Sequence, residues 1–341
     1  MTDPDAIDGV PEPERRQRAR GHDEARQAVL GTLGAGRLPG AIMLHGPQGI
    51  GKATFAFEMA VALLTATGDE PEHRVAEQVA ALSHPNLFLL RRSPKDSKGF
   101  YTVIRVEEVR QVREGLHHTR GRSGHRVVVI DSIDDCNPSA ANALLKTLEE
   151  PPADTTFFLI SHRPGQLLPT IRSRCHNLAL RPIADAEVEA VLREHDPALG
   201  QTELQRAVAL AGGRPRRAFE TLALAPDSAL GALQGWLANP LAHPTAVPLG
   251  LADALGASAQ GPELSFAREM LFDWLADEAR NAALPPLNRA RLASATELWE
   301  KASALFAEAD EINLDMKQTL AALFDAISRH VALTQPAAEP Q

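Results

Sequence analysis

The chain has 341 residues, of which 44% are hydrophobic and 23% are charged, and its net charge is −9. This length predicts two or three folded units, and the acidic balance argues against a protein whose whole surface binds nucleic acid. No apolar run reaches the eighteen residues that a membrane span needs, and the polar segment 1–20 lacks a signal-peptide core, so we expect no membrane association and a cytoplasmic location.

Short apolar runs, each bounded by turn residues, alternate with helical patterns in the first half of the chain. Their hydrophobicity is continuous, which is typical of strands covered on both faces by crossover helices. We therefore predict an α/β domain with a five-stranded parallel sheet over 22–181, preceded by a flexible tail over 1–21. The expected strands are Ala41–His45, Asn86–Leu90, Val127–Asp131, Phe157–Ser161 and Asn177–Leu180.

A phosphate loop follows the first expected strand and precedes a helical run over 53–64, which is the context that this motif needs. Its glycines, Gly46, Gly49 and Gly51, let backbone N–H groups converge on phosphate oxygens, and Lys52 neutralises charge on the outer phosphates. A tight turn without a ligand is the less favoured alternative. Ala53 replaces the Ser or Thr whose hydroxyl ligates magnesium, so metal-dependent chemistry should suffer more than phosphate binding.

The third expected strand ends at Asp131, which is placed to hold a metal-bound water. Ser132 follows it where many ATPases have a Glu that polarises the attacking water, and a hydroxyl lacks the required basicity. Asp134 and Asp135 lie past the strand end, and we interpret them as a solvated acidic turn. The pattern predicts that the chain holds ATP or ADP without hydrolysing it.

Three further features follow along the chain. Asn137 should cap a helix that Pro151 stops and that packs on the sheet. Ser161 ends the fourth strand, where its hydroxyl either contacts a γ-phosphate or caps the next turn. Arg172 and Arg174 precede the fifth strand, and by residue type alone such a pair belongs to the surface or to a salt bridge.

Beyond residue 181 the strand pattern ends and helical patterns continue. We predict a small helical lid over 182–224, an all-helical C-terminal domain over 225–333 and a disordered tail over 334–341. Two apolar stripes of the C-terminal domain should form its core, and one of them is also a candidate oligomer interface. They comprise Phe266, Met270, Leu271, Trp274 and Leu275, and then Leu320, Leu323, Phe324 and Ile327.

Taken in order, the phosphate loop, the acidic strand, the run Asn142–Pro152 and the triplet Ser173-Arg174-Cys175 resemble the clamp-loader branch of the AAA+ ATPases. Within that branch the chain is most similar to the delta-prime subunits of bacterial DNA polymerase III. The resemblance covers 22–224 well and the remainder only in length and helical class. It implies an AAA+ P-loop domain, a lid and a C-terminal collar that serves oligomerisation.

The resemblance also implies roles for two arginines. Arg174 would be a finger that reaches the ATP bound by a neighbouring subunit, with Arg172 as the competing candidate. Arg217 would be the lid arginine called sensor 2, an assignment for which Arg214 and Arg216 compete. Many members of the family carry a four-Cys zinc module, but residues 65–87 contain no Cys, so we expect no zinc or other metal.

The implied function is a clamp-loader subunit that acts as scaffold and arginine donor, with little or no ATPase activity of its own. Its implied partners are the gamma or tau motor subunits, the delta subunit, the beta sliding clamp and primer-template DNA. The alternative is an active ATPase motor subunit that uses Lys52 and Asp131 with an unconventional base. A DNA-binding initiator would need a basic C-terminal helix-turn-helix, and residues 263–332 are too acidic for one.

Overall fold

The computed structural model describes residues 4–334 except for 96–98, 118–122, 226–227, 258–261 and 313–314. The chain divides into two compact units, residues 1–222 and 223–341. The division falls close to the limit at 224 that we predicted between the lid and the C-terminal domain. The disordered tail expected over 334–341 lies, apart from Thr334, outside the described residues.

A five-stranded parallel sheet forms the centre of the first unit, with the strand order β2-β3-β4-β1-β5. The sheet confirms the predicted fold class, and every predicted strand is present to within two residues at either end. The neighbouring strands β2 and β3 end side by side, since Arg91 pairs in register with Asp131. The strands are β1 (Ala41–His45), β2 (Leu87–Arg91), β3 (Arg126–Asp131), β4 (Thr155–Ser161) and β5 (His176–Ala179).

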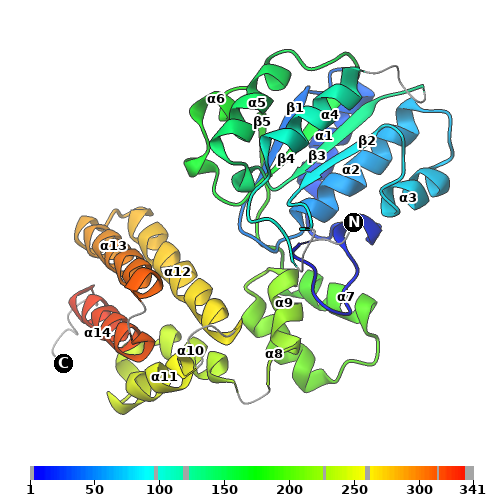
Figure 1. The fold of residues 1–341 in the computed structure, drawn as a ribbon. Coiled ribbons are helices and arrows are strands. Elements are labelled where there is room, and N and C mark those ends of the chain that lie inside the picture. The colour runs from blue at the N-terminus through cyan, green and yellow to red at the C-terminus, as the bar shows by residue number, and fades with distance from the viewer. Residues whose placement is uncertain are drawn as a thin grey trace. The chain divides into compact units, whose positions relative to one another are not determined.

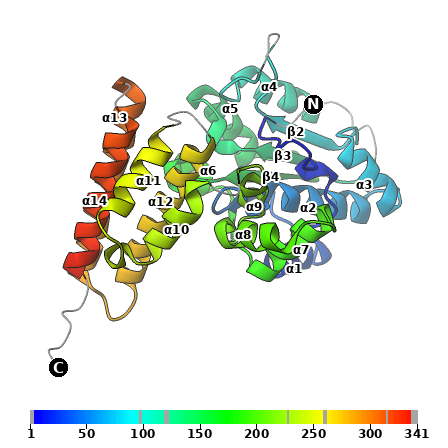
Figure 2. The same cartoon turned by 90° about the horizontal axis from the view of Figure 1, so that it is seen from below.

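Helices cover both faces of this sheet, as Figures 1 and 2 show. Alternate residues of one strand point to opposite faces, so Val127 and Val129 enter one apolar cluster while Val128 and Ile130 enter the other. Burial on both sides explains the continuous hydrophobicity of the strands. One face carries α1 (Asp23–Gly34), α2 (Lys52–Thr67) and α3 (Glu72–Ala80), and the other carries α4 (Val106–His117), α5 (Pro138–Glu149) and α6 (Pro169–Arg172).

The lid follows β5 as three helices, α7 (Asp185–His195), α8 (Gln201–Ala211) and α9 (Pro215–Leu222). Its core contains Val188, Leu192 and Leu204. Gly212 caps the C-terminus of α8 with a left-handed φ of 55°, and Gly213 follows with a φ of 70°. This double glycine turns the chain so that α9 begins beside the phosphate loop, where Arg216 N–H donates to Gly49 O at 3.1 Å.

The N-terminal segment is not the flexible tail that its polar composition suggested. Residues 13–15 form a short 3-10 helix, η1 (Pro13–Arg15), and both Glu14 and Ala19 are 4% exposed. Ile7 and Val10 pack against the lid core. The prediction failed because the partners that bury these residues lie far away in the sequence.

The second unit is a bundle of helices whose longest members are α12, α13 and α14. Its core holds Trp236 against Phe324, with ring centroids 4.9 Å apart. Both predicted apolar stripes lie in this core, because all their members except the half-buried Trp274 are buried. The helices are α10 (Ala229–Ala238), η4 (Pro240–Ala242), α11 (Ala246–Gly256), α12 (Pro262–Ala283), α13 (Arg289–Ile312) and α14 (Met316–Thr334).

These stripes are therefore occupied by packing within the chain, and an interface with another protein has to use other residues. Across the parts of the chain that the structure describes, no helix is both long enough and apolar enough to span a bilayer.

Candidate functional site

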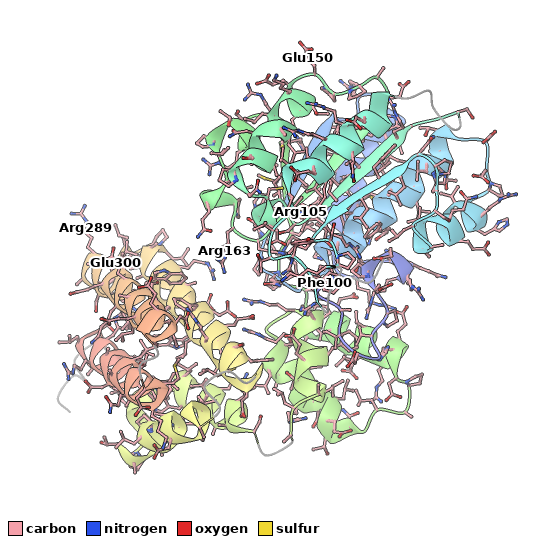
Figure 3. All side chains as sticks on the ribbon, viewed as in Figure 1. Phe100, Arg105, Glu150, Arg163, Arg289 and Glu300 are labelled. Atoms are coloured by element: carbon pink, nitrogen blue, oxygen red, sulfur yellow. The ribbon has the colours of Figure 1, made fainter. Side chains whose placement is uncertain are left out.

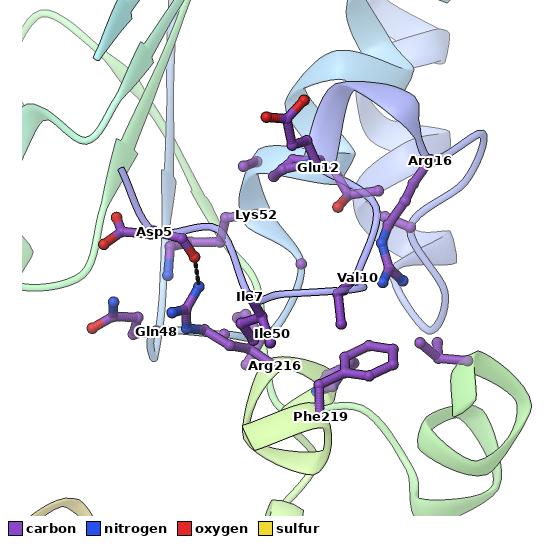
Figure 4. Close-up of a pocket in the computed structure, with 18 of the residues that line it drawn as sticks. Asp5, Ile7, Val10, Glu12, Arg16, Gln48, Ile50, Lys52, Arg216 and Phe219 are labelled. Atoms are coloured by element: carbon purple, nitrogen blue, oxygen red, sulfur yellow. Dashed lines mark hydrogen bonds between the residues drawn. The ribbon is translucent and has the colours of Figure 1, made fainter. Parts of the chain in front are cut away.

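A pocket in the first unit lies where the phosphate loop, the ends of β3 and β4, the lid and the N-terminal segment meet (Figure 4). The predicted residues Gly49, Gly51, Lys52 and Asp131 line it. The crossover topology explains this arrangement, because parallel strands end at one edge of the sheet and ligand sites form there. The N-terminal segment contributes a further wall that the sequence did not predict.

The glycines of the phosphate loop are required by its backbone. Gly46, Gly49 and Gly51 have φ values of 148°, 82° and 99°, which other residues rarely adopt. A Cβ on Gly46 would lie 2.2 Å from Leu180 O, and one on Gly49 would lie 2.8 Å from Arg216 Cβ. The loop thus keeps the shape of a phosphate cradle, although Gly46 itself does not line the pocket.

Lys52 begins α2 and is 3% exposed. Its Nζ donates to Gly46 O at 2.8 Å and to Pro47 O at 2.6 Å. Burial lowers the pKa of this ammonium to about 7, although the carboxylates of Asp131 and Asp134 act in the opposite direction. A phosphate that enters the pocket would add negative charge beside Lys52 and favour the protonated form of this buried lysine.

Asp131, at the end of β3, faces a buried arginine from the next strand. Arg91 Nη2 lies 4.0 Å from Asp131 Oδ2, and the Arg91 side chain is 0% exposed. Glu14 of the N-terminal segment binds the same guanidinium through two hydrogen bonds of 3.2 and 3.1 Å. The local sequence does not reveal Arg91 and Glu14 as partners, because these residues lie 77 positions apart.

Asp134 is not part of a solvated turn, which corrects our interpretation of this residue. Its Oδ1 accepts from Ser161 Oγ at 3.0 Å and its Oδ2 accepts from His162 N–H at 2.6 Å. Ser161 is fully buried, so its hydroxyl ties the end of β4 to the turn after β3. The neighbouring His162 lines the pocket, where burial and Lys52 lower its pKa to about 4.

The lid arginine that lines the pocket is Arg216, whereas Arg217 is not among the lining residues. The Arg216 guanidinium donates to the backbone O of Asp5, as Figure 4 shows, and pairs with Glu220 at 2.8 Å. Arg217 is buried within the unit at 5% exposure. Successive residues of a helix point about 100° apart, so the phase of α9, which the motif alone does not define, selects Arg216.

Arg174 is held at the surface by its own chain. Its Nη1 donates to Thr170 O at 2.8 Å, and its Nη2 lies 2.5 Å from Oε1 of Glu149, the last residue of α5. The Arg174 side chain is 32% exposed, and Arg174 does not line the pocket. Arg172 makes only a long contact of 3.5 Å with Pro164 O. Of the two candidates, Arg174 is therefore the oriented one.

Asn137 caps α5 as predicted, because its side chain accepts from Ala140 N–H at 2.8 Å. The prediction that the chain binds no zinc stays a prediction. Within the described residues, no group of three or more His, Cys, Asp or Glu side chains is arranged to hold a metal ion.

Residues 21–184 match the family model described as DNA polymerase III, delta subunit. The chain is 39% identical over 198 residues to the DNA polymerase III subunit delta′ of Pseudomonas aeruginosa, covering 56% of this chain and 58% of that protein. It is 31% identical over 200 residues to the Escherichia coli subunit delta′, covering 57% of each chain.

A more distant match is the DNA polymerase III subunit gamma/tau of Mycobacterium bovis, 27% identical over 215 residues, which cover 59% of this chain and 35% of that protein. The chain therefore spans less than two thirds of the length of these relatives. The family model covers the phosphate loop, Asp131 and Arg174.

Proposed function

We propose that this protein is a delta-prime-type subunit of a clamp loader, because residues 21–184 match the family model described as DNA polymerase III, delta subunit. In this role it helps to load the sliding clamp onto primed DNA as a scaffold and as a donor of an arginine finger. Its own ATP hydrolysis is weak or absent. The similarity to delta′ subunits, which exceeds that to gamma/tau, supports this proposal.

The observation that carries the proposal is the contrast between the chain's own pocket and Arg174. The pocket lacks two groups that hydrolysis uses, because Ala53 has no hydroxyl for magnesium and Ser132 has no carboxylate for water. Arg174, by contrast, is exposed, charged and oriented by two partners outside that pocket. Such a guanidinium can act on a phosphate that another chain brings to it.

Phosphoryl transfer builds negative charge on the transferred group, and an arginine finger supplied in trans stabilises it. Arg174 would do this for ATP bound by a gamma or tau subunit. The other proposed partners are the delta subunit, the beta clamp and primer-template DNA, and the proposed location is the cytoplasm. The chain's pocket would hold ATP or ADP as a structural ligand.

The test is reconstitution with the presumed partner subunits, followed by measurement of DNA-stimulated ATPase. We expect Arg174→Ala to leave assembly intact and to lower the rate at least tenfold, since such fingers contribute about 10³ to 10⁵ in rate. Arg172→Ala is the matched control because Arg172 lies two residues away at the end of α6 and makes only a long hydrogen bond to Pro164 O. It should change the rate less than twofold. An unchanged ATPase rate with Arg174→Ala would show that Arg174 is not an arginine finger.

The rival function, an active motor subunit, predicts ATP turnover by the isolated chain. Its support is the intact loop with Lys52, whose burial and contacts keep it at the pocket. We expect negligible turnover by the purified protein. Robust hydrolysis that Lys52→Ala abolishes would favour the motor and contradict the scaffold.

A further inference from the structure

The pocket does not offer the ligands that magnesium needs. In phosphate-loop sites, the ion is held by the hydroxyl that follows the loop lysine and by the acid at the end of another strand of the sheet. Here the first position is Ala53, which has only a methyl group. The second is Asp131, which lies beside a positively charged side chain of the same protein.

The cation beside Asp131 is built into the fold. Arg91 ends β2, its side chain is 0% exposed, and its register partner on β3 is Asp131. A guanidinium does not lose its proton in proteins, so this charge is permanent. Glu14 holds the Arg91 guanidinium with two hydrogen bonds, and the centroid of the Phe57 ring lies 6.0 Å from Arg91 Cζ. A divalent ion at Asp131 would have to compete for that carboxylate with a guanidinium that cannot move into water.

The phosphate-binding backbone of the loop does not depend on the missing magnesium ligands. The glycine geometry of the loop is preserved, and Lys52 stands at the start of a 16-residue helix whose N-terminal dipole favours anions. Asp131 lines the pocket together with Lys52, so its carboxylate lies close to where an outer phosphate would sit. Without a bridging metal, that carboxylate would repel a third phosphate more than the first two.

We propose that this pocket binds a nucleoside diphosphate, ADP, without magnesium, and that Arg91 takes the place of the metal as the counter-ion of Asp131. This inference rests on the nucleotide pocket of the proposed function and not on the finger. The pocket then discriminates against ATP as well as against magnesium.

The test is isothermal titration calorimetry of the full chain with ADP, in excess EDTA and in excess MgCl₂. Because magnesium complexes ADP in solution and the pocket takes the metal-free form, excess MgCl₂ should leave ADP binding unchanged or weaken it. ATP in EDTA should bind at least tenfold more weakly than ADP. Absence of ADP binding up to millimolar concentration, a tenfold tightening by magnesium, or equal affinity for ATP would each overturn the proposal.

Variants separate the two defects. Ala53→Thr supplies the missing hydroxyl but leaves Arg91 in place, so magnesium should still not tighten ADP binding. A gain of tenfold or more with Ala53→Thr alone would show that Arg91 does not exclude the metal. Adding Glu14→Leu and Arg91→Met removes the buried pair with similar volumes, and magnesium should then tighten ADP binding at least fivefold.

If the triple variant fails to fold, the titrations of the wild type and of Ala53→Thr still decide the question. Failure of this proposal is also distinguishable from failure of the proposed function. The finger is measured through Arg174 on ATP held by other subunits, whereas the titration reports only the pocket of the isolated chain.

Discussion

Replacing Glu14 by Gln should destabilise the first unit by about 3 kcal/mol. Glu14 and Arg91 are 4% and 2% exposed, and two hydrogen bonds of 3.2 and 3.1 Å join them. Breaking a buried pair by removing one charge costs roughly 3 to 5 kcal/mol, because the other charge stays buried without compensation. Asp131, 4.0 Å from the same guanidinium, offsets part of that loss and sets the value at the lower end.

The positions of the tryptophans allow the two units to be followed separately. Trp236, Trp274 and Trp299 are the only tryptophans of the chain, and all lie in the second unit. Tryptophan fluorescence therefore reports the second unit, whereas far-UV circular dichroism reports both. We expect Glu14→Gln to lower the thermal midpoint of the first unit by about 6 to 12 °C, at roughly 2 to 4 °C per kcal/mol for this size.

The matched control is Arg18→Gln in the same N-terminal segment. Arg18 pairs with Asp23 at 3.0 Å, but both side chains are 64% exposed, and such pairs contribute about 0 to 1 kcal/mol. The double change Glu14→Leu with Arg91→Met should recover most of the stability, because the buried ion pair is replaced by two apolar side chains of similar volume. If Glu14→Gln shifts the midpoint no more than Arg18→Gln, the buried pair does not stabilise the segment.

Four further predictions concern other parts of the chain. Glu149→Ala should lower the DNA-stimulated ATPase of the reconstituted complex by about three- to tenfold. It should have no further effect in an Arg174→Ala background, because Glu149 acts only through the Arg174 guanidinium. The control is Glu150→Ala, since the neighbouring Glu150 points outward in Figure 3. Burial lowers the pKa of Lys52 to about 7, so the lysine loses its charge between pH 6 and pH 8 and ADP should bind about tenfold more weakly at pH 8. Calorimetry should find no such pH dependence with Lys52→Met. Asn137→Ala should cost about 1 kcal/mol in urea unfolding followed by circular dichroism, since one N–H of the first turn loses its acceptor. Hydrogen bonds from the His330 ring and from Arg291 hold the pKa of Glu278 below its ordinary 4.5. The ionised Glu278 therefore stabilises the second unit above pH 4.5, and this contribution is lost as the pH falls below that value. Glu278→Gln should flatten the acid unfolding of the second unit, followed by tryptophan fluorescence.

The elements that were predicted well are those whose signal is local. The strand β1 begins and ends where its apolar run does, and Asn137 caps α5 as its position before Pro138 indicated. The phosphate loop is equally local, because glycine is the residue that tolerates the φ values of 82° and 99° at Gly49 and Gly51. In each case a few consecutive residues carry the physical cause.

The errors share one cause, which is a partner distant in the sequence. Glu14 reads as a charged residue of a polar tail until Arg91 is placed against it. Asp134 reads as a solvated acid until β4 brings Ser161 to it. The choice between neighbouring lid arginines depends on how α9 is rotated against the loop, which no spacing within the motif defines.

The sequence by itself therefore determined the class of fold, the location of the pocket and the absence of a hydroxyl at Ala53 and of a carboxylate at Ser132. Those features depend on periodicity, on glycine and on residue type, which are properties of short segments. The tertiary structure decided which charges meet, placing Arg91 beside Asp131 and Glu149 beside Arg174. Electrostatic energies depend on separation and burial, and both quantities exist only after the chain has folded.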